Sequence, residues 1–169
     1  LSKAWGLAGL RAGCAAGPPD LVATLAAAGS PYTVSGPSIA LAAAWLAAGE
    51  PAVRHFVERV RAERAALFDR LAALGARPLP SQANFVLARF RDAAWVRDAL
   101  AGLGIAVRWF GGRPGLEDAL RITCPGDPGR FERLSAALGA VLAPEAVLVD
   151  LDAALAAGNV REALAARLE

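Results

Sequence analysis

A long helical stripe followed by strand patterns constrains the fold more than any other feature of this 169-residue chain. Pro51 suits the first turn of a helix, and apolar residues then recur at helical spacing as far as Gly75, with one polar break at Glu63 and Arg64. The next patterned stretch, "ANFVLARF" (83–90), alternates like a half-buried strand. This order predicts a long helix that packs against a sheet.

The segments that follow extend the same pattern. Two helical stripes flank two short apolar strands, and a Gly- and Pro-containing loop joins the strands, which could therefore pair as a hairpin. We predict an α/β chain with an α+β small domain, in which antiparallel strands pack on helices. The expected segments are 95–103 (helix), 105–110 and 119–124 (strands), and 127–142 (helix).

The first fifty residues give weaker signals. "LRAGCAAG" (10–17) predicts a short strand of small residues, after which Asp20 is expected to cap a helix that runs to about Ala28. An Ala-rich helix is expected over 39–48. Its Trp45 lies in an apolar pattern, which predicts a place in the core.

Composition excludes several function classes. The net charge is only +2 and the arginines are interleaved with acids, so we expect no nucleic-acid partner. No apolar stretch is long enough to cross a membrane, and one histidine with two distant cysteines predicts no metal site. A cytoplasmic protein is the simplest expectation. Because the chain contains no Met, we also expect it to be a piece of a longer protein.

Lys3 is the only lysine in a chain whose other basic residues are all arginine, 17 of the 18 Lys and Arg. An arginine cannot form a Schiff base, so carbonyl chemistry would explain the exception. Ser2 and Arg11 could bind a cofactor phosphate, with Gly6 and Gly9 giving the turn between them. The alternative is a chance Ser-Lys pair before an ordinary Gly-rich turn.

The stretch "SKAWGLAGLRAG" resembles the cofactor-lysine motif of fold-type I pyridoxal 5'-phosphate (PLP) enzymes, and most of all that of histidinol-phosphate aminotransferases. "SPYTVSGPSIALAAAWL", "SQANFVLARF" and "GIAVRWFGGRPGLEDALRITCPGDPGRFERLSAAL" are similar to later segments of that family in the same order. The resemblance extends to about residue 143. It implies the C-terminal part of that fold, with 1–36 ending the large PLP-binding domain, 37–143 forming the small C-terminal domain, and 144–169 a stub or extension.

The resemblance also implies roles for individual residues. Lys3 would bind the cofactor covalently and move a proton, while Ser2 and Arg11 would hold the cofactor phosphate. Arg121 in "LRIT" would bind the substrate carboxylate or its equivalent, and Arg108 the substrate phosphate. Leu120 and Ile122 flank Arg121 on the opposite face of the strand, which we expect to be buried, and this favours a binding role for Arg121. For Arg108, a solvated arginine at a strand edge is an equal alternative.

The implied reaction transfers an amino group between an amino-phosphate and a 2-oxo acid, as in histidine biosynthesis. A full-length parent would be a homodimer with a large domain before the lysine, so we expect the isolated chain to be inactive. The resemblance equally allows a related PLP enzyme such as a threonine-phosphate decarboxylase. A non-catalytic α+β module is the alternative from another class.

The tail "AVLVDLDAALA" weakly resembles the first motif of haloacid-dehalogenase-like phosphatases. Asp150 and Asp152 match the two aspartates of that motif, but Ala153 stands where the family has glycine. The resemblance implies a truncated phosphatase-like module after the aminotransferase part. A surface pair of aspartates at the end of a strand is the alternative.

Overall fold

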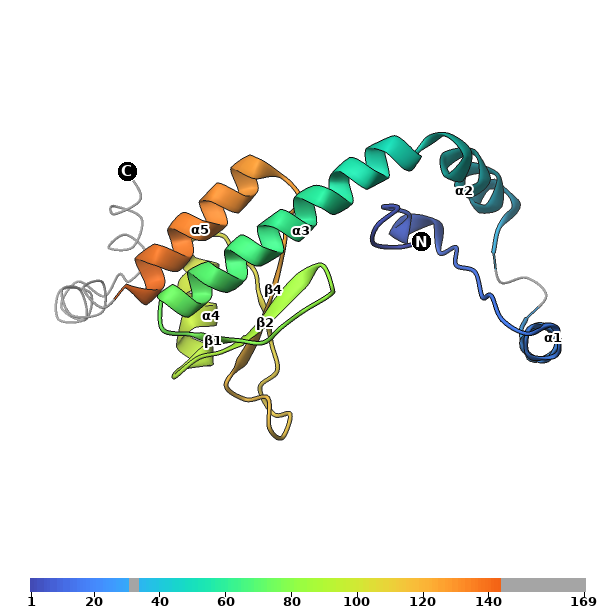
Figure 1. The fold of residues 1–169 in the computed structure, drawn as a ribbon. Coiled ribbons are helices and arrows are strands. Elements are labelled where there is room, and N and C mark those ends of the chain that lie inside the picture. Colours follow the sequence, from blue (N-terminus) through green and yellow to red (C-terminus); the bar gives the residue numbers. More distant parts are fainter. Residues whose placement is uncertain (31–33, 144–169) are drawn as a thin grey trace. The chain divides into compact units, whose positions relative to one another are not determined.

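The computed structural model describes residues 1–30 and 34–143. They form two compact units, Leu1–Glu58 and the residues from Arg59 onward, and the division falls within the long helix. The predicted domain boundaries after residues 36 and 143 remain predictions. In chain order the elements are the 3-10 helix η1 (Ala8–Leu10), α1 (Pro19–Ala28), α2 (Gly36–Ala48), α3 (Glu50–Ala73), β1 (Arg77–Pro78), β2 (Phe85–Arg89), α4 (Ala93–Gly102), β3 (Arg108–Trp109), β4 (Ala119–Thr123) and α5 (Pro128–Leu142) (Figure 1).

The first unit differs from its prediction in three places. The strand expected over 10–17 is not formed, because a strand needs a partner and no described strand pairs with this segment. Pro18 occupies the N-cap of α1, so Asp20 lies in the first turn instead of capping it. Trp45 is 40% exposed, and Ala42 is the one buried hydrophobic residue among the described residues of this unit.

The helices of the second unit end where the sequence predicts. Gly75 adopts φ +80°, and the Gly75 and Ala76 amides donate to the carbonyls of Ala72 and Leu71, a Schellman ending for α3. Asp127 caps α5 by accepting a hydrogen bond from the Arg130 amide at 2.9 Å.

Within the described ranges, no helix is both long and apolar enough to cross a membrane.

The second unit contains a four-stranded antiparallel sheet in the order β1-β2-β4-β3. The three predicted strands are present, although β3 is shorter than the predicted 105–110. The hairpin predicted between β3 and β4 is confirmed. The two-residue strand β1 has no alternating pattern in the sequence, and the prediction missed it.

The core lies between one face of the sheet and the three helices α3, α4 and α5 (Figure 1). The predicted class, antiparallel strands packed on helices, is therefore confirmed. Replacing one of the fully buried leucines by Ala should cost about 2–5 kcal/mol of stability. The fully buried side chains are Leu67, Leu71, Val86, Leu100, Leu120, Ile122, Leu138 and Val141.

None of the described helices of this unit covers the opposite face of the sheet. Along β4, Leu120 and Ile122 are buried whereas Arg121 and Thr123 are exposed, which confirms the alternation expected from the sequence. The open face therefore displays the arginines that the sequence singled out.

Candidate functional site

Arg108 and Arg121 are directly opposite each other on β3 and β4. Opposite residues of an antiparallel pair project from the same face with their Cβ atoms about 4.5–5.5 Å apart. Both arginines belong to the exposed positions of their strands. The sheet thus brings together two side chains that are thirteen positions apart in the sequence.

Aromatic rings support both guanidinium groups. The Arg121 guanidinium carbon lies 5.2 Å from the centre of the Phe85 ring, and that of Arg108 lies 6.0 Å from the Phe110 ring. Among the described residues, no acid forms an ion pair with either arginine. Like charges placed directly opposite in a sheet repel, so this pair would be stabilised by a bound anion.

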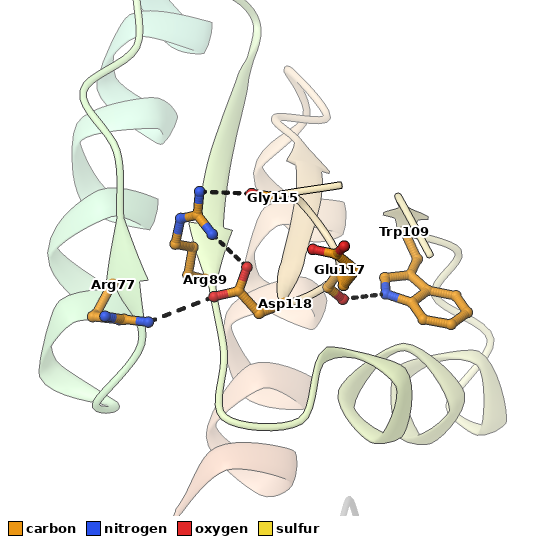
Figure 2. A network of polar contacts seen from close by, with 6 residues as sticks. All are labelled: Arg77, Arg89, Trp109, Gly115, Glu117 and Asp118. Atoms are coloured by element: carbon orange, nitrogen blue, oxygen red, sulfur yellow. Dashed lines mark hydrogen bonds and ion pairs between the residues drawn. The ribbon is translucent and has the colours of Figure 1, made fainter. Parts of the chain in front are cut away.

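A second arginine pair lies on the same sheet and has an acid of its own. Arg77 and Arg89 are opposite each other on β1 and β2. Asp118 accepts a hydrogen bond from Arg89 at 2.5 Å and forms an ion pair with Arg77 at 3.5 Å (Figure 2). Figure 2 shows the Asp118 carboxylate between the two guanidinium groups. The charge of this pair is therefore partly compensated within the chain.

The loop that joins β3 to β4 is attached at both sides. Arg89 donates to the Gly115 carbonyl at 2.9 Å, and the Trp109 indole N–H donates to the Glu117 carbonyl at 2.8 Å (Figure 2). The Arg97 guanidinium lies 4.3 Å from the centre of the Trp109 ring. These contacts attach the half of the hairpin loop nearest β4 to β2 and β3, and so they favour the register in which Arg108 faces Arg121.

Lys3 lies in a tight turn of the first unit. The Gly6 amide donates to the Lys3 carbonyl at 3.1 Å, and Gly6 has φ +67°, a conformation that glycine adopts without a Cβ clash. The Lys3 side chain is exposed, with no hydrogen bond or ion pair to the described residues, and it borders an open cavity of about 220 Å³. Trp5, Trp45 and Phe56 also line this cavity.

Arg11 follows η1 in a strained backbone conformation. Its φ of +52° is the one left-handed value among the described non-glycine residues. Its guanidinium donates to the Ala8 carbonyl at 3.2 Å, so the side chain folds back over η1. Ser2 is half-buried beside Lys3. The three predicted cofactor ligands thus belong to the first unit, and the two predicted substrate ligands to the second.

Sequence reasoning missed Glu63, which it treated as a polar break in the α3 stripe. Glu63 is only 6% exposed, and its Oε2 accepts a hydrogen bond from the Gly126 amide at 2.7 Å. Nearby, burial and the Glu63 charge together raise the pKa of the Cys124 thiol to about 11. The interruption of an apolar stripe by a charged residue was the sequence signal that could have identified Glu63.

Asp150 and Asp152 lie outside the described residues, so their predicted role stays a prediction.

Comparison with known proteins identifies the family. The profile of the family described as "Aminotransferase class I and II" matches residues 1–138. The chain belongs to the class I and II aminotransferase family. Enzymes of this family are transaminases that generally depend on PLP and act on small molecules. The resemblance inferred from the lysine motif is confirmed at this level.

Two similar curated proteins share a more specific name within this family. The histidinol-phosphate aminotransferase of Xylella fastidiosa (strain 9a5c) is 41% identical over 141 residues, which are 82% of this chain and 38% of that protein. That of Thermoanaerobacter pseudethanolicus is 40% identical over 124 residues, 73% of this chain and 35% of that protein. The chain therefore spans little more than a third of the length of these relatives.

A solved structure shares the fold. A crystal structure of a Burkholderia pseudomallei protein, provisionally classed as an aminotransferase, superposes with a TM-score of 0.67 at 33% sequence identity. The match covers 81% of this chain and 42% of that protein. The mixed helical and antiparallel-sheet architecture is thus an aminotransferase architecture.

Proposed function

We propose that this chain supplies the cofactor lysine and the substrate-anion site of an aminotransferase of the histidinol-phosphate type. The parent enzyme would transfer an amino group between an amino-phosphate and a 2-oxo acid, as a cytoplasmic homodimer serving histidine biosynthesis. The single observation that carries the proposal is the register of β3 and β4, which places Arg108 opposite Arg121 with no described acid bound to either. The names of the relatives support the substrate type.

Arg108 and Arg121 would bind the anionic groups of both substrates. A guanidinium presents a planar set of donors that matches carboxylate and phosphate oxygens, and two such groups on one face can share a single anion. Arg121 would receive the carboxylate of the 2-oxo acid, and Arg108 would reach the phosphate of the amino-phosphate. The Phe85 ring beneath Arg121 would restrict the orientations of its guanidinium.

Lys3, Ser2 and Arg11 fit a PLP site by their chemistry. PLP, when bound, supplies an aldehyde for the amino group and an electron sink for the carbon that loses its proton. The exposed Lys3 amine would hold the cofactor and accept the proton from the substrate Cα. Ser2 and Arg11 would provide a hydroxyl and a guanidinium for the phosphate, once Arg11 exchanges its bond to the Ala8 carbonyl for one to the phosphate.

The cofactor assignment can be tested on the chain itself, since it holds a single lysine. The purified chain is incubated with PLP, reduced with borohydride, and digested for mass mapping of the pyridoxyl group. We expect the adduct on Lys3, and its loss in Lys3→Arg, which keeps the positive charge. An adduct found only on the α-amine of Leu1, or equal labelling of the wild-type chain and Lys3→Arg, would contradict the assignment.

A further inference from the structure

Three polar side chains of α3 attach this helix to one end of the sheet. The Glu63 carboxylate accepts the Gly126 N–H, and the Arg59 guanidinium donates to the carbonyl of the same glycine at 3.2 Å. One position beyond Glu63, the Arg64 guanidinium donates to the Ala83 carbonyl at 2.9 Å. These contacts arise from neighbouring positions of one helix, and together they form what we term the α3 clamp: Arg59, Glu63 and Arg64.

The α3 clamp holds the two chain segments that close the β2–β4 ladder. Ala83 lies two residues before β2 begins at Phe85, and Gly126 lies three residues after β4 ends at Thr123. Phe85 and Thr123 are opposite each other, and the Cys124 amide donates to the Asn84 carbonyl at 3.0 Å just beyond them. Both attachment points therefore belong to the same end of the ladder.

Arg121 lies close to this end, on the open face. It is two residues before Thr123 along β4, and its guanidinium rests over the ring of Phe85, the first residue of β2. A change in the ending of β4, or in the start of β2, would move Arg121 relative to that ring. The α3 clamp and the Arg121 stack are thus two connections across the same pair of strand ends.

Burial of the Glu63 carboxylate costs free energy. A buried carboxylate loses its hydration, and only its Oε2 regains a hydrogen bond. Its Oε1 is buried without a hydrogen-bond partner in the described structure. A helix position that served packing alone would be filled at less cost by an apolar side chain. A positional role for this carboxylate would account for its burial.

We propose that Glu63 is a positioning residue for the anion site. By holding the Gly126 turn, in which glycine has φ +69°, it fixes the end of β4 and so keeps the Arg121 guanidinium over Phe85. The anion-binding part of this inference rests on the function proposed for Arg121. The geometric part, the link from Glu63 to the Arg121–Phe85 stack, does not.

The test uses NMR spectra of the ¹⁵N,¹³C-labelled 169-residue chain, titrated with inorganic phosphate. Glu63→Met removes the acceptor but fills a similar volume, whereas Glu63→Gln retains an oxygen that can accept the Gly126 N–H. Val60→Ala is the matched control, because Val60 is a buried α3 residue that contributes to the core. Signals of the folded form report the Arg121 side chain and its ring-current shift from Phe85, independently of the folded fraction.

We expect Glu63→Met to remove the ring-current shift of Arg121 and to weaken phosphate binding about tenfold, which is the scale of losing one hydrogen bond to a charged group. Glu63→Gln should restore both, and Val60→Ala should change neither. An unchanged Arg121 shift in Glu63→Met, or an equal change in Val60→Ala, would overturn the positioning role. If Glu63→Met does not fold, the half-buried Arg64→Met should give a smaller shift change in the same direction, and no change there would equally overturn it.

The same spectra distinguish failure of the proposed anion site from failure of the positioning role. If the wild-type chain shows no phosphate-dependent shift at Arg121, the function proposed for the arginine pair fails. The ring-current shift of Arg121 in the Glu63 variants still decides whether Glu63 positions that side chain.

Discussion

Two pairs of opposite arginines share one sheet, and they differ in whether the chain supplies an acid for them. Arg77 and Arg89 are bridged by Asp118, whereas Arg108 and Arg121 contact aromatic rings and have no acid among the described residues. Repulsion between opposite like charges costs stability in both places. The first pair is compensated within the chain, whereas under the proposed function the second would take its counter-charge from a bound anion.

The largest expected effect is the loss of anion affinity in Arg121→Ala. A hydrogen bond to a charged group is worth about 1.5–3 kcal/mol, so phosphate affinity should fall by more than tenfold. Arg77→Ala removes the same charge from the compensated pair, does not touch the hairpin loop, and should leave phosphate affinity nearly unchanged. Isothermal titration with phosphate measures both. Equal losses in the two variants would show that binding follows total charge and not the pair.

A rise in pH should lower the stability of the fold through the Cys124 thiol. Cys124 follows β4 and is buried, and its pKa of about 11 lies above the ordinary thiol value. Between that ordinary value and about 11, the unfolded chain releases a thiol proton that the folded chain keeps. Stability therefore falls as pH rises through this window, by at most about 1.4 kcal/mol per pH unit, and the loss is complete above the folded pKa.

Urea unfolding of the wild-type chain and Cys124→Ser at pH 8, 9, 10 and 11 measures this dependence. The wild-type curve should fall more steeply than that of Cys124→Ser, which cannot release that proton. Parallel curves would mean that the Cys124 thiol titrates alike in the folded and unfolded chains. Phosphate affinities for comparing the arginine pairs are best measured at neutral pH, below the ordinary thiol pKa, where this thiol keeps its proton in both states.

Asp118→Asn should make the compensated pair behave more like the uncompensated one. The Asp118 and Arg89 side chains are about one-third exposed, so solvent screening limits the expected loss of stability to about 0.5–1 kcal/mol. In addition, Arg89 side-chain signals should begin to shift with phosphate. Asp69→Asn is the control of equal charge change, since Asp69 is an exposed residue of α3, and α3 packs on the other face of the sheet. If the Arg89 side-chain signals in Asp118→Asn do not shift with phosphate, then the Asp118 carboxylate is not what distinguishes the two arginine pairs.

The sequence predicted one strand of the second pair better than its partner. Leu120 and Ile122 identified the buried face of β4, so the exposure of Arg121 followed from local alternation. The register that brings Arg108 opposite Arg121 depends on the length and path of the hairpin loop, which Arg89 and Trp109 fix from outside it. Contacts of that kind leave no periodic signal.

Long-range partners also explain the missed residues. Glu63 bonds to a glycine 63 positions away, and within α3 alone it is indistinguishable from a solvated break in the stripe. Asp118 bridges two strands whose pairing the sequence did not predict, because β1 has only two residues. Conversely, the 10–17 segment has the composition of a strand without a described strand to pair with. Local patterns therefore predicted most of the helices and strands, whereas contacts between residues distant in the sequence determine where the polar side chains lie.

The smallest expected effect comes from giving the uncompensated pair an internal acid. Leu87 is directly opposite Arg121 on β2 and is half-buried, so Leu87→Glu places a carboxylate on the open face beside that guanidinium. Opposite charges at such a pair contribute about 0.2–1 kcal/mol, so in urea unfolding Leu87→Glu should be more stable than Leu87→Gln by that order. Phosphate affinity should fall by up to about fivefold, because the new carboxylate competes for Arg121. Leu87→Gln has nearly the same shape without the charge, and if it weakens phosphate binding as much as Leu87→Glu, then shape and not charge compensation distinguishes the two pairs.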